Sequence, residues 1–328
     1  MSRRRRAWLA AAVVAAAAAC VAGGLRSGVG VAPGAAHAQP PSTAPDPGLP
    51  ASPIESAPRV VDYELEAVLD PDAHTVAGTG TVRWTNASSV AVDHLFVHLY
   101  MNAFANDATV FRRERVSGFR GNVALDTGNV EVTRFFVKEL GRDVWPEAPH
   151  TPGDPNDATD IRVPLGRAVE PGETITIELA FKTKLPSVAL RAGYAGSFHM
   201  VAQWFPKIAK LEPDGSFAHF PYERLSEFYA DFGSYRVTVD TPEAFVVGAT
   251  GVEVASVAAG GRIRRTFEQI AVHDFAFAAW NHFREKTAEA EGVKIRCLYP
   301  PTLDAAADVE IALSLIHISE PTRQAEIS

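Results

Sequence analysis

Hydrophobic and polar residues alternate along the chain from residue 60 onward. The alternation runs through residues 63–69, resumes at 75–85 and again at 92–100, with short polar turns between the runs. A period of two is typical of strands that bury one face. The pattern therefore predicts three consecutive antiparallel strands, all in one sheet, over residues 60–100.

The same pattern continues toward the C-terminus. Residues 161–165 and 174–181 flank the turn sequence at 170–173, and further β-rich runs lie at 235–239, 262–267, 275–280 and 293–299. No helical period of ten or more residues lies between residues 60 and 300. The sequence thus predicts a mainly β fold, an antiparallel β-sandwich or saddle-like domain over residues 60–299.

The pattern changes at Pro300 and Pro301. Thr302 can cap a helix that continues to Leu313, with acidic residues in its first turn. We expect residues 300–313 to begin a further domain. Residues 314–328 offer no continuing pattern and resemble translated sequencing-adapter read-through, so we interpret them as an artefactual tail; a natural but divergent terminus is the alternative.

The N-terminus has the composition of an export signal. Four arginines at residues 3–6 precede an apolar, alanine-rich run at 7–21, which is too short to span a membrane. We expect residues 1–38 to be a signal peptide that is cleaved before Gln39, which places the protein in the periplasm, at the outer membrane or outside the cell. Processing as a lipoprotein with a lipid anchor at Cys20 is an alternative to cleavage before Gln39. A twin-arginine export signal is compatible with either kind of processing.

Residues 39–59 contain seven prolines and are expected to form an extended linker. The formal net charge is −8, and removal of residues 1–38, with five arginines and no acidic residue, changes it to −8 − 5 = −13. Such a charge argues against nucleic acid as a partner. The two cysteines, Cys20 and Cys297, leave no disulfide framework after cleavage.

Aromatic residues are concentrated in residues 198–232. This segment contains six Phe, two Tyr and one Trp, and Asp214-Gly215 within it predicts a tight turn between two extended runs. Several short motifs in and around it resemble the N-terminal β-domain of the gluzincin zinc aminopeptidases, peptidase family M1. The motifs are 69–71 (LDP), 78–80 (GTG), 98–104 (HLYMNAF), 203–207 (QWFPK), 246–251 (VVGATG) and 273–278 (HDFAFA).

The resemblance implies an exported zinc aminopeptidase that removes N-terminal residues from peptides, with its zinc in a domain that begins near residue 300. A helical H-E-x-x-H motif, which such enzymes need, is absent from the sequence. His94 and His98 have the spacing of its two histidines, but their neighbours alternate as in a strand, so the two rings lie too far apart to share a zinc ion. We therefore expect no metal ligands and no catalytic residues in this chain, and no zinc bound by it.

The resemblance also indicates substrate-binding residues. Gln203 resembles the residue that the family's β-domain sends to the edge of the cleft to hold the free amino terminus of the peptide, and its carbonyl oxygen would accept from the ammonium group. Glu227 is a second candidate. In each case the alternative is a structural role, such as a Gln that pairs with a neighbouring strand, and the aromatic segment itself could be core at a domain boundary.

Two functions follow as hypotheses. The first is the N-terminal portion of an exported zinc aminopeptidase, inactive by itself, that holds a peptide by its free N-terminus. The second is a complete, non-catalytic exported β-sandwich that binds protein or sugar. Cys297 is expected to be a small buried side chain rather than a nucleophile.

Overall fold

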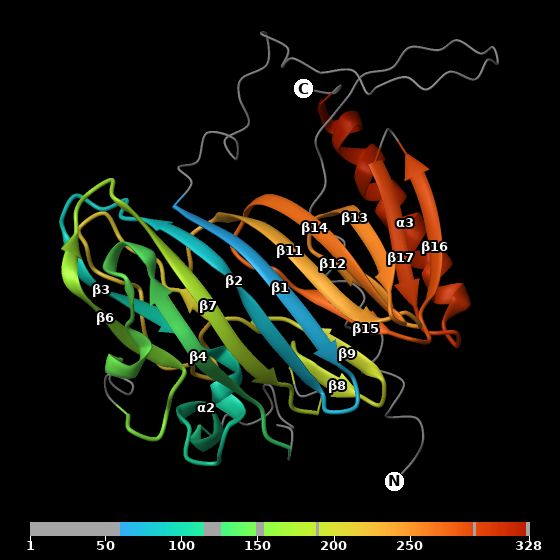
Figure 1. Cartoon of the computed structure of the whole chain (residues 1–328). Helices are drawn as coiled ribbons and strands as arrows, with labels where there is room; N and C mark the ends of the chain where they lie inside the picture. The colour runs from blue at the N-terminus through green and yellow to red at the C-terminus, as the bar shows by residue number, and fades with distance from the viewer. Residues whose placement is uncertain (1–59, 115–125, 149–153, 188–189, 291–292, 326–328) are drawn as a thin grey trace.

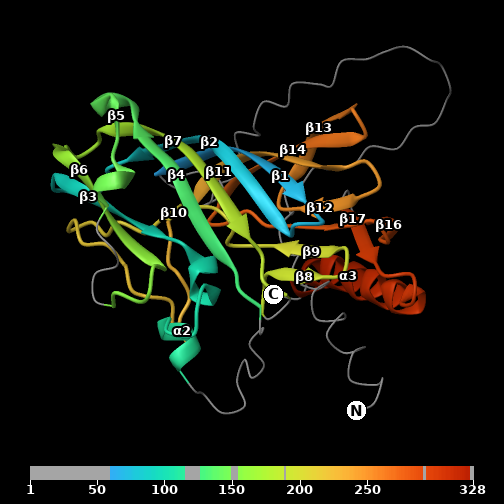
Figure 2. The same ribbon diagram turned by 60° about the horizontal axis from the view of Figure 1, so that its bottom comes forward.

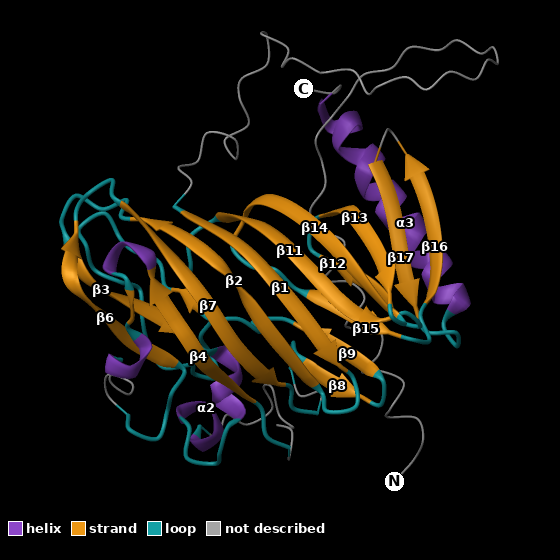
Figure 3. Ribbon diagram, viewed as in Figure 1, coloured by secondary structure: helices purple, strands orange, loops and turns teal. Residues whose placement is uncertain are grey.

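The computed structural model describes residues 60–114, 126–148, 154–187, 190–290 and 293–325. The predicted signal peptide and linker, including Cys20 and Gln39, lie outside the described residues. The prediction of a mainly β fold is confirmed (Figure 3). The helices described before residue 300 are short: η3 (Tyr100–Phe104), α2 (Val110–Arg113), η4 (Lys138–Leu140) and η5 (Trp145–Glu147).

An eight-stranded sheet forms the largest layer of the protein (Figure 1). Its strand order is β13-β14-β11-β1-β2-β7-β4-β5. The strands are β1 (Val61–Asp70), β2 (Thr75–Thr85), β4 (Asn129–Val137), β5 (Arg142–Asp143), β7 (Thr174–Lys184), β11 (Gly233–Pro242), β13 (Val252–Ala259) and β14 (Arg262–Val272).

Burial along β1 follows the alternation of the sequence. Tyr63, Leu65 and Ala67 are buried, whereas Glu64 and Glu66 between them are exposed. One face of the sheet therefore packs on the core and the other faces solvent, as an alternating strand requires.

The glycines of β2 are needed because neighbouring groups occupy the space beside them. A Cβ atom at Gly78 would lie 2.2 Å from the ring of Phe181, and one at Gly80 would lie 2.1 Å from the carbonyl oxygen of Glu64. Since real Cβ atoms do not approach other heavy atoms so closely, only glycine fits. The motif at residues 78–80 thus has a packing role in the sheet.

The sheet is mixed rather than purely antiparallel. Among the strand pairs that the structure describes, β1 and β11 are parallel, with Val61 opposite Gly233 and Val68 opposite Asp240, and the other pairs are antiparallel. This pair is the exception within the predominantly antiparallel fold that the sequence predicts, and it joins strands that are far apart in the sequence.

The strand over Val92–His98, β3, belongs to a second sheet. It lies between β10 (Lys207–Ile208) and β6 (Asp160–Val169). The prediction that residues 60–100 form a single sheet is therefore wrong. The buried side chain of Asn86 donates from Nδ2 to the carbonyl oxygens of Val90 (2.8 Å) and Val169 (2.9 Å), and so holds the turn that leads out of the large sheet.

A third sheet contains four strands in the order β12-β15-β9-β8. These are β8 (Gly193–Ala195), β9 (Phe198–Val201), β12 (Val246–Ala249) and β15 (Phe277–Trp280). Figure 2 shows β8 and β9 beyond the ends of β1 and β2. One extensive core cluster includes buried residues of all three sheets, among them Leu65, Val97 and Val201.

The C-terminal elements form a separate small unit (Figure 1). The hairpin of β16 (Arg284–Ala290) and β17 (Val293–Tyr299) packs against α3 (Asp304–Ala325), and Cys297, Tyr299 and Ala307 share a core cluster of their own. The thiol of Cys297 is buried as predicted, and burial raises its pKa.

The predicted cap of the C-terminal helix is wrong by one position. The helix begins at Asp304, and the carbonyl oxygen of Leu303, not that of Thr302, accepts the first helical hydrogen bond, from Ala307 (3.0 Å). The backbone of residues 314–325 continues this helix, and the interpretation of the tail stays a prediction. Among the described residues, no helix is both long and apolar enough to cross a membrane.

Candidate functional site

The aromatic segment 198–232 leaves the regular pattern of the sheets. Beyond β9 and β10, the turn predicted at Asp214-Gly215 is present, with Gly215 at φ +87°. The flanking runs do not form the two extended strands expected from the sequence, since one isolated bridge, Leu211 to Phe217, joins them. Isolated backbone hydrogen bonds, such as those from Lys210 to Tyr229 and from Ala218 to Lys210, together with side-chain contacts, therefore hold this segment in place of a strand ladder.

Trp204 anchors the segment in the core. Its side chain is fully buried, and its Nε1 donates to the carbonyl oxygen of Phe275 (3.1 Å). The hydroxyl of Thr183 donates to the backbone carbonyl oxygen of Trp204 (2.6 Å). The neighbouring Phe205 packs edge-on against Tyr63. The motif at residues 203–207 is thus fastened from several sides, as buried polar groups require.

Gln203 lies just before this anchor in an uncommon backbone conformation. Its φ is +54°, in the left-handed region that residues with a side chain rarely adopt. The side chain is half-buried, and its Oε1 accepts a hydrogen bond from Nζ of Lys207 (2.9 Å). Gln203 therefore pairs with a buried lysine of β10, a contact that also fits the structural alternative, a Gln paired with a neighbouring strand.

Lys207 is the centre of this group. It is 3% exposed, and its Nζ also lies 2.9 Å from Oδ1 of Asp274, which is 20% exposed. Burial lowers the pKa of Lys207, and the negative charge of Asp274 opposes this shift. The ammonium group is thus removed from water but retains two oxygen partners.

Glu227 forms an ion pair with Arg191 at the surface, where both side chains are more than one third exposed. The positive charge of Arg191 also contributes to the lowered pKa of Lys207, so this pair lies in the same region as Gln203. No contact described in the structure joins Gln203 directly to Glu227. The two predicted site residues therefore share a region but not a hydrogen bond.

The aromatic residues of the segment divide into two groups. Trp204, Phe205 and Phe228 are buried, and Phe217 and Phe220 are partly buried against the core. By contrast, Tyr229 is 52% exposed and Phe232 is 55% exposed, and the aliphatic Leu225 nearby in the sequence is 71% exposed. These three apolar side chains are thus open to solvent.

A His–Asp–His group around a buried carboxylate was not apparent from the sequence. The carboxylate of Asp160 is fully buried, with Oδ2 2.8 Å from Nδ1 of His219 and Oδ1 3.6 Å from Nδ1 of His98. His219 stacks on Phe96 and His98 stacks on Phe228, so the segment covers one face of β3. Because the three residues lie far apart along the chain, no local motif indicates the group.

The residues described do not fit the zinc of the family's enzymes. Within these residues, no group of three or more His, Cys, Asp or Glu side chains is arranged to hold a metal ion. His94 and His98 lie on the same strand, as predicted, and each faces its own partner, Asp93 for His94 and Phe228 for His98. No zinc-dependent step is derived from these side chains.

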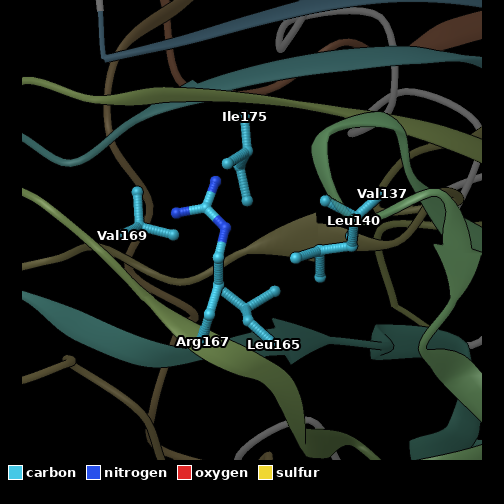
Figure 4. Close-up of a pocket in the computed structure, with 6 residues that line it drawn as sticks. All are labelled: Val137, Leu140, Leu165, Arg167, Val169 and Ile175. Atoms are coloured by element: carbon cyan, nitrogen blue, oxygen red, sulfur yellow. The ribbon is translucent and has the colours of Figure 1, made fainter.

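Two hollows on the surface lie away from Gln203 and Glu227. Figure 4 shows one between β4, β6 and β7, into which the guanidinium group of Arg167 projects, and it has no room for a water molecule. A larger hollow of about 290 Å³ lies on the exposed face of the large sheet. Its Arg236 already pairs with Glu268, and the uncharged hydroxyl of its Ser234 donates to Asp62.

Comparison with known proteins gives one kind of match. Neither a family model nor a curated protein matches the sequence. The chain is structurally similar to M1 zinc metallopeptidases. A mutant of the enzyme from Deinococcus radiodurans is 15% identical, with a TM-score of 0.42 over 70% of this chain and 44% of that chain.

Two further solved structures give similar values. The Deinococcus radiodurans mutant bound to a Tyr-Ser-Ala substrate is 14% identical, with a TM-score of 0.42, over 73% of this chain and 46% of that chain. A two-domain M1 zinc metallopeptidase mutant bound to L-arginine is 14% identical, with a TM-score of 0.43 over the same shares. The chain therefore spans less than half of the length of these structures. A likeness at this level assigns no activity to the chain.

Proposed function

We propose that this chain is the N-terminal portion of an exported zinc-dependent aminopeptidase, and that it helps to hold the free N-terminus of a peptide substrate. The observation that carries the proposal is the state of Gln203. By the resemblance of the motif at 203–207, Gln203 corresponds to a substrate-binding residue, and its side chain is half-buried and accepts from Lys207, on a backbone with φ +54°.

Strain at Gln203 supports a functional role. A residue with a side chain at φ +54° costs on the order of 1 kcal/mol or more compared with an ordinary conformation. Such a cost persists where the surroundings impose it, and here Trp204 and Lys207 do so on the C-terminal side. Strained residues of this kind concentrate at binding sites.

Within this proposal, the described residues bind and orient the peptide, and the zinc chemistry belongs to a domain that continues from residues 300–313. A zinc ion held by that further domain would supply the chemistry, by polarising a water molecule for hydrolysis of the first peptide bond. The chain as given is expected to be inactive alone.

Sequencing of the source DNA across codon 313 tests the proposal directly. We expect an open reading frame that encodes H-E-x-x-H downstream, and chelator-sensitive release of N-terminal residues by the longer product. A stop codon directly after an authentic domain would overturn the proposal. It would leave the second hypothesis, a non-catalytic β-sandwich that binds protein or sugar.

Export is a separate part of the proposal and has its own test. Mass spectrometry of the mature protein from an expressing bacterium is expected to give a chain that starts at Gln39. An acylated Cys20 at the start would assign the protein to the lipoproteins instead, and an intact Met1 would overturn export.

A further inference from the structure

The turn between β1 and β2 contacts the third sheet through a pair of histidines. His74 is the last residue of this turn, and its Nδ1 lies 3.0 Å from Nε2 of His199 on β9. The ring of His74 also stacks on Tyr194 of β8, with the ring centres 3.5 Å apart. The backbone of His74 has φ +53°, in the left-handed region where glycine or asparagine is usual. A histidine at this position therefore points to a role for its side chain.

The hydrogen bonds of the pair determine where its protons lie. Nδ1 of His199 lies 3.0 Å from the carbonyl oxygen of Ser197, and a carbonyl oxygen can only accept, so this Nδ1 carries a proton. A neutral imidazole has one N–H group, and Nε2 of His199 is therefore an acceptor. Nδ1 of His74 must then be the donor between the two rings.

The two histidines consequently respond differently to a further proton. His74 can bind one on its other nitrogen, Nε2, and still donate to His199, and the resulting positive charge is favourable over the face of Tyr194. His199 can bind one only on Nε2, which places a second N–H group opposite that of His74 at 3.0 Å. The contact therefore survives a proton on His74 but not one on His199.

The surroundings of the pair supply no negative charge to hold a second proton. The titratable and charged groups on the elements around it include Asp70, Asp72, Asp126, Lys184, Tyr194 and Glu243. The hydroxyl of Tyr194 donates to Asp126 (2.8 Å), and Nζ of Lys184 lies 3.6 Å from the same carboxylate. Asp70 accepts from two backbone N–H groups of the turn. Among the described residues, no carboxylate forms a hydrogen bond or ion pair with either imidazole.

We propose that His74 and His199 form an acid-sensitive latch between the large sheet and the third sheet, closed while His199 is neutral and opened when His199 binds a proton. The closed latch holds the turn against β9. It also holds the end of β7, because the N–H group of Leu185 donates to the carbonyl oxygen of His74 (2.9 Å). Since the closed state resists a proton on His199 and the open state does not, opening increases as the pH decreases. The latch is independent of the proposed peptide binding.

The imidazole ¹⁵N signals of the unaltered protein test the assignment of the protons. At pH 7 we expect His199 to carry its proton on Nδ1 and to show an unprotonated, hydrogen-bonded Nε2. As the pH decreases, the first proton that the pair gains should appear on His74. A His199 protonated at Nε2 at pH 7, or a His199 that gains the first proton, would overturn the latch. This measurement needs no substitution, so it does not depend on the folding of a variant.

Amide hydrogen exchange tests the opening itself, with the N–H group of Leu185 as the reporter. Burial holds the pKa of His199 at about 4 in the closed state, against about 6.5 when the ring is released. After correction for the intrinsic pH dependence of exchange, the protection of Leu185 should therefore fall on the order of thirtyfold from pH 6 to pH 4.

The internal reference is the N–H group of Thr85, which donates to the carbonyl oxygen of Val60 (2.9 Å) at the opposite end of the β1–β2 pair. Its protection should fall much less than that of Leu185. Equal losses at the two amides would indicate unfolding of the whole protein and would overturn a local latch.

The variant His74→Gly removes the latch and suits the left-handed backbone of the turn. At pH 6 we expect the protection of Leu185 to fall roughly two- to tenfold, the range for one neutral hydrogen bond, and its further loss at pH 4 to be smaller than in the unaltered protein. His94→Gln is the matched control, because His94 pairs with Asp93 on β3. It should leave both values unchanged. Unchanged values in His74→Gly would overturn the proposal.

Discussion

The large sheet and the segment 198–232 both bury aromatic side chains, but different interactions fix their backbones. In the sheet, ladders such as β1–β2 satisfy the backbone, and side chains alternate between core and solvent. In the segment, β9 and β10 together provide only six residues of strand. Side chains of other elements supply part of the remaining partners: the hydroxyl of Thr183 donates to the carbonyl oxygen of Trp204, and the hydroxyls of Tyr63 and Thr159 accept from the backbone N–H groups of Ile208 and Tyr222.

The difference explains where polar groups become buried. A regular strand satisfies its own backbone, so its inward positions can all be apolar. An irregular segment in the core needs polar partners from the elements around it, because unpaired backbone groups are costly there. The buried lysine and the His–Asp–His group also occur where the segment crosses the core, and the candidate site lies in the same place.

Truncation of Trp204 should show that the segment belongs to the core despite its irregular backbone. We expect Trp204→Ala to lower the free energy of unfolding by about 3–5 kcal/mol, as for other large buried aromatic residues. Urea denaturation followed by circular dichroism measures the change. Leu225→Ala, at a site that is 71% exposed, is the control and should stay within about 0.5 kcal/mol. Equal effects of the two variants would contradict the comparison.

Within the sheet, the most sensitive position is expected to be a glycine. Gly80→Ala forces a Cβ atom against the carbonyl oxygen of Glu64, and the backbones of β1 and β2 must separate to admit it. The expected loss is about 2–3 kcal/mol in the same urea assay. Thr79→Ala, at the adjacent exposed position, should change stability by less than about 0.5 kcal/mol. A Gly80→Ala variant as stable as the parent protein would show that the strands are not closely packed there.

The segment should also make stability depend on pH, through His199 of β9. This side chain is fully buried, its Nδ1–H donates to the carbonyl oxygen of Ser197 and its Nε2 faces Nδ1 of His74 at 3.0 Å. Burial lowers the pKa of His199 to about 4, from about 6.5 in an unfolded chain. The unfolded state therefore binds the proton more readily, and stability falls as the pH decreases from about 6.5 toward 4.

The expected loss is about 2 kcal/mol between pH 7.5 and pH 5 for this group. Thermal unfolding at the two pH values measures it, and the control is the same pair of measurements on His199→Gln. Burial also lowers the pKa of His98, to about 3, so both proteins should lose stability in acid. Only the difference between them reports on His199, and an identical loss in the two proteins would refute the assignment.

The sequence predicts the parts of the fold in which pattern and burial agree. The alternation in β1 and β2 gives their buried faces correctly. It fails for β3, where Leu95, Phe96, Val97 and His98 are all buried because the segment covers the face opposite the core. An alternating pattern predicts that one face of a strand is buried. It does not predict that another segment of the chain covers the polar face as well.

The choice of Gln203 as a site residue stays a prediction. Gln203 could be named from its motif, but its partner could not, because a lysine in a sequence gives no indication of burial. Lys207 is contacted by Asp274, 67 residues away, and Asp160 by His219, 59 residues away. Such pairs depend on the tertiary arrangement of β10 and the strands around it. Local patterns contain no information about them.

The smallest effect is expected at the edge of the sheet, where alternation no longer corresponds to burial. All eight residues of β13 are exposed, including Val252, Val254 and Val257. Val257→Thr should therefore change the free energy of unfolding by less than about 0.5 kcal/mol. Val237→Thr on β11, a fully buried position in the same sheet, is the contrasting variant and should cost more than 1 kcal/mol in the same assay. A comparable loss at Val257 would mean that β13 is covered in solution.

The parallel pairing of β1 with β11 has a consequence for the order in which the protein can be assembled. Val61 lies opposite Gly233, so 233 − 61 = 172 residues must be synthesised after the first partner before the second exists. At roughly 5–20 residues per second, this takes on the order of ten to thirty seconds. During that interval the hairpin of β1 and β2 has an open edge at the position that β11 later fills. A nascent chain therefore presents the middle of its largest sheet as an unpaired strand, and a chaperone that shields this edge would be most needed before residue 242 emerges.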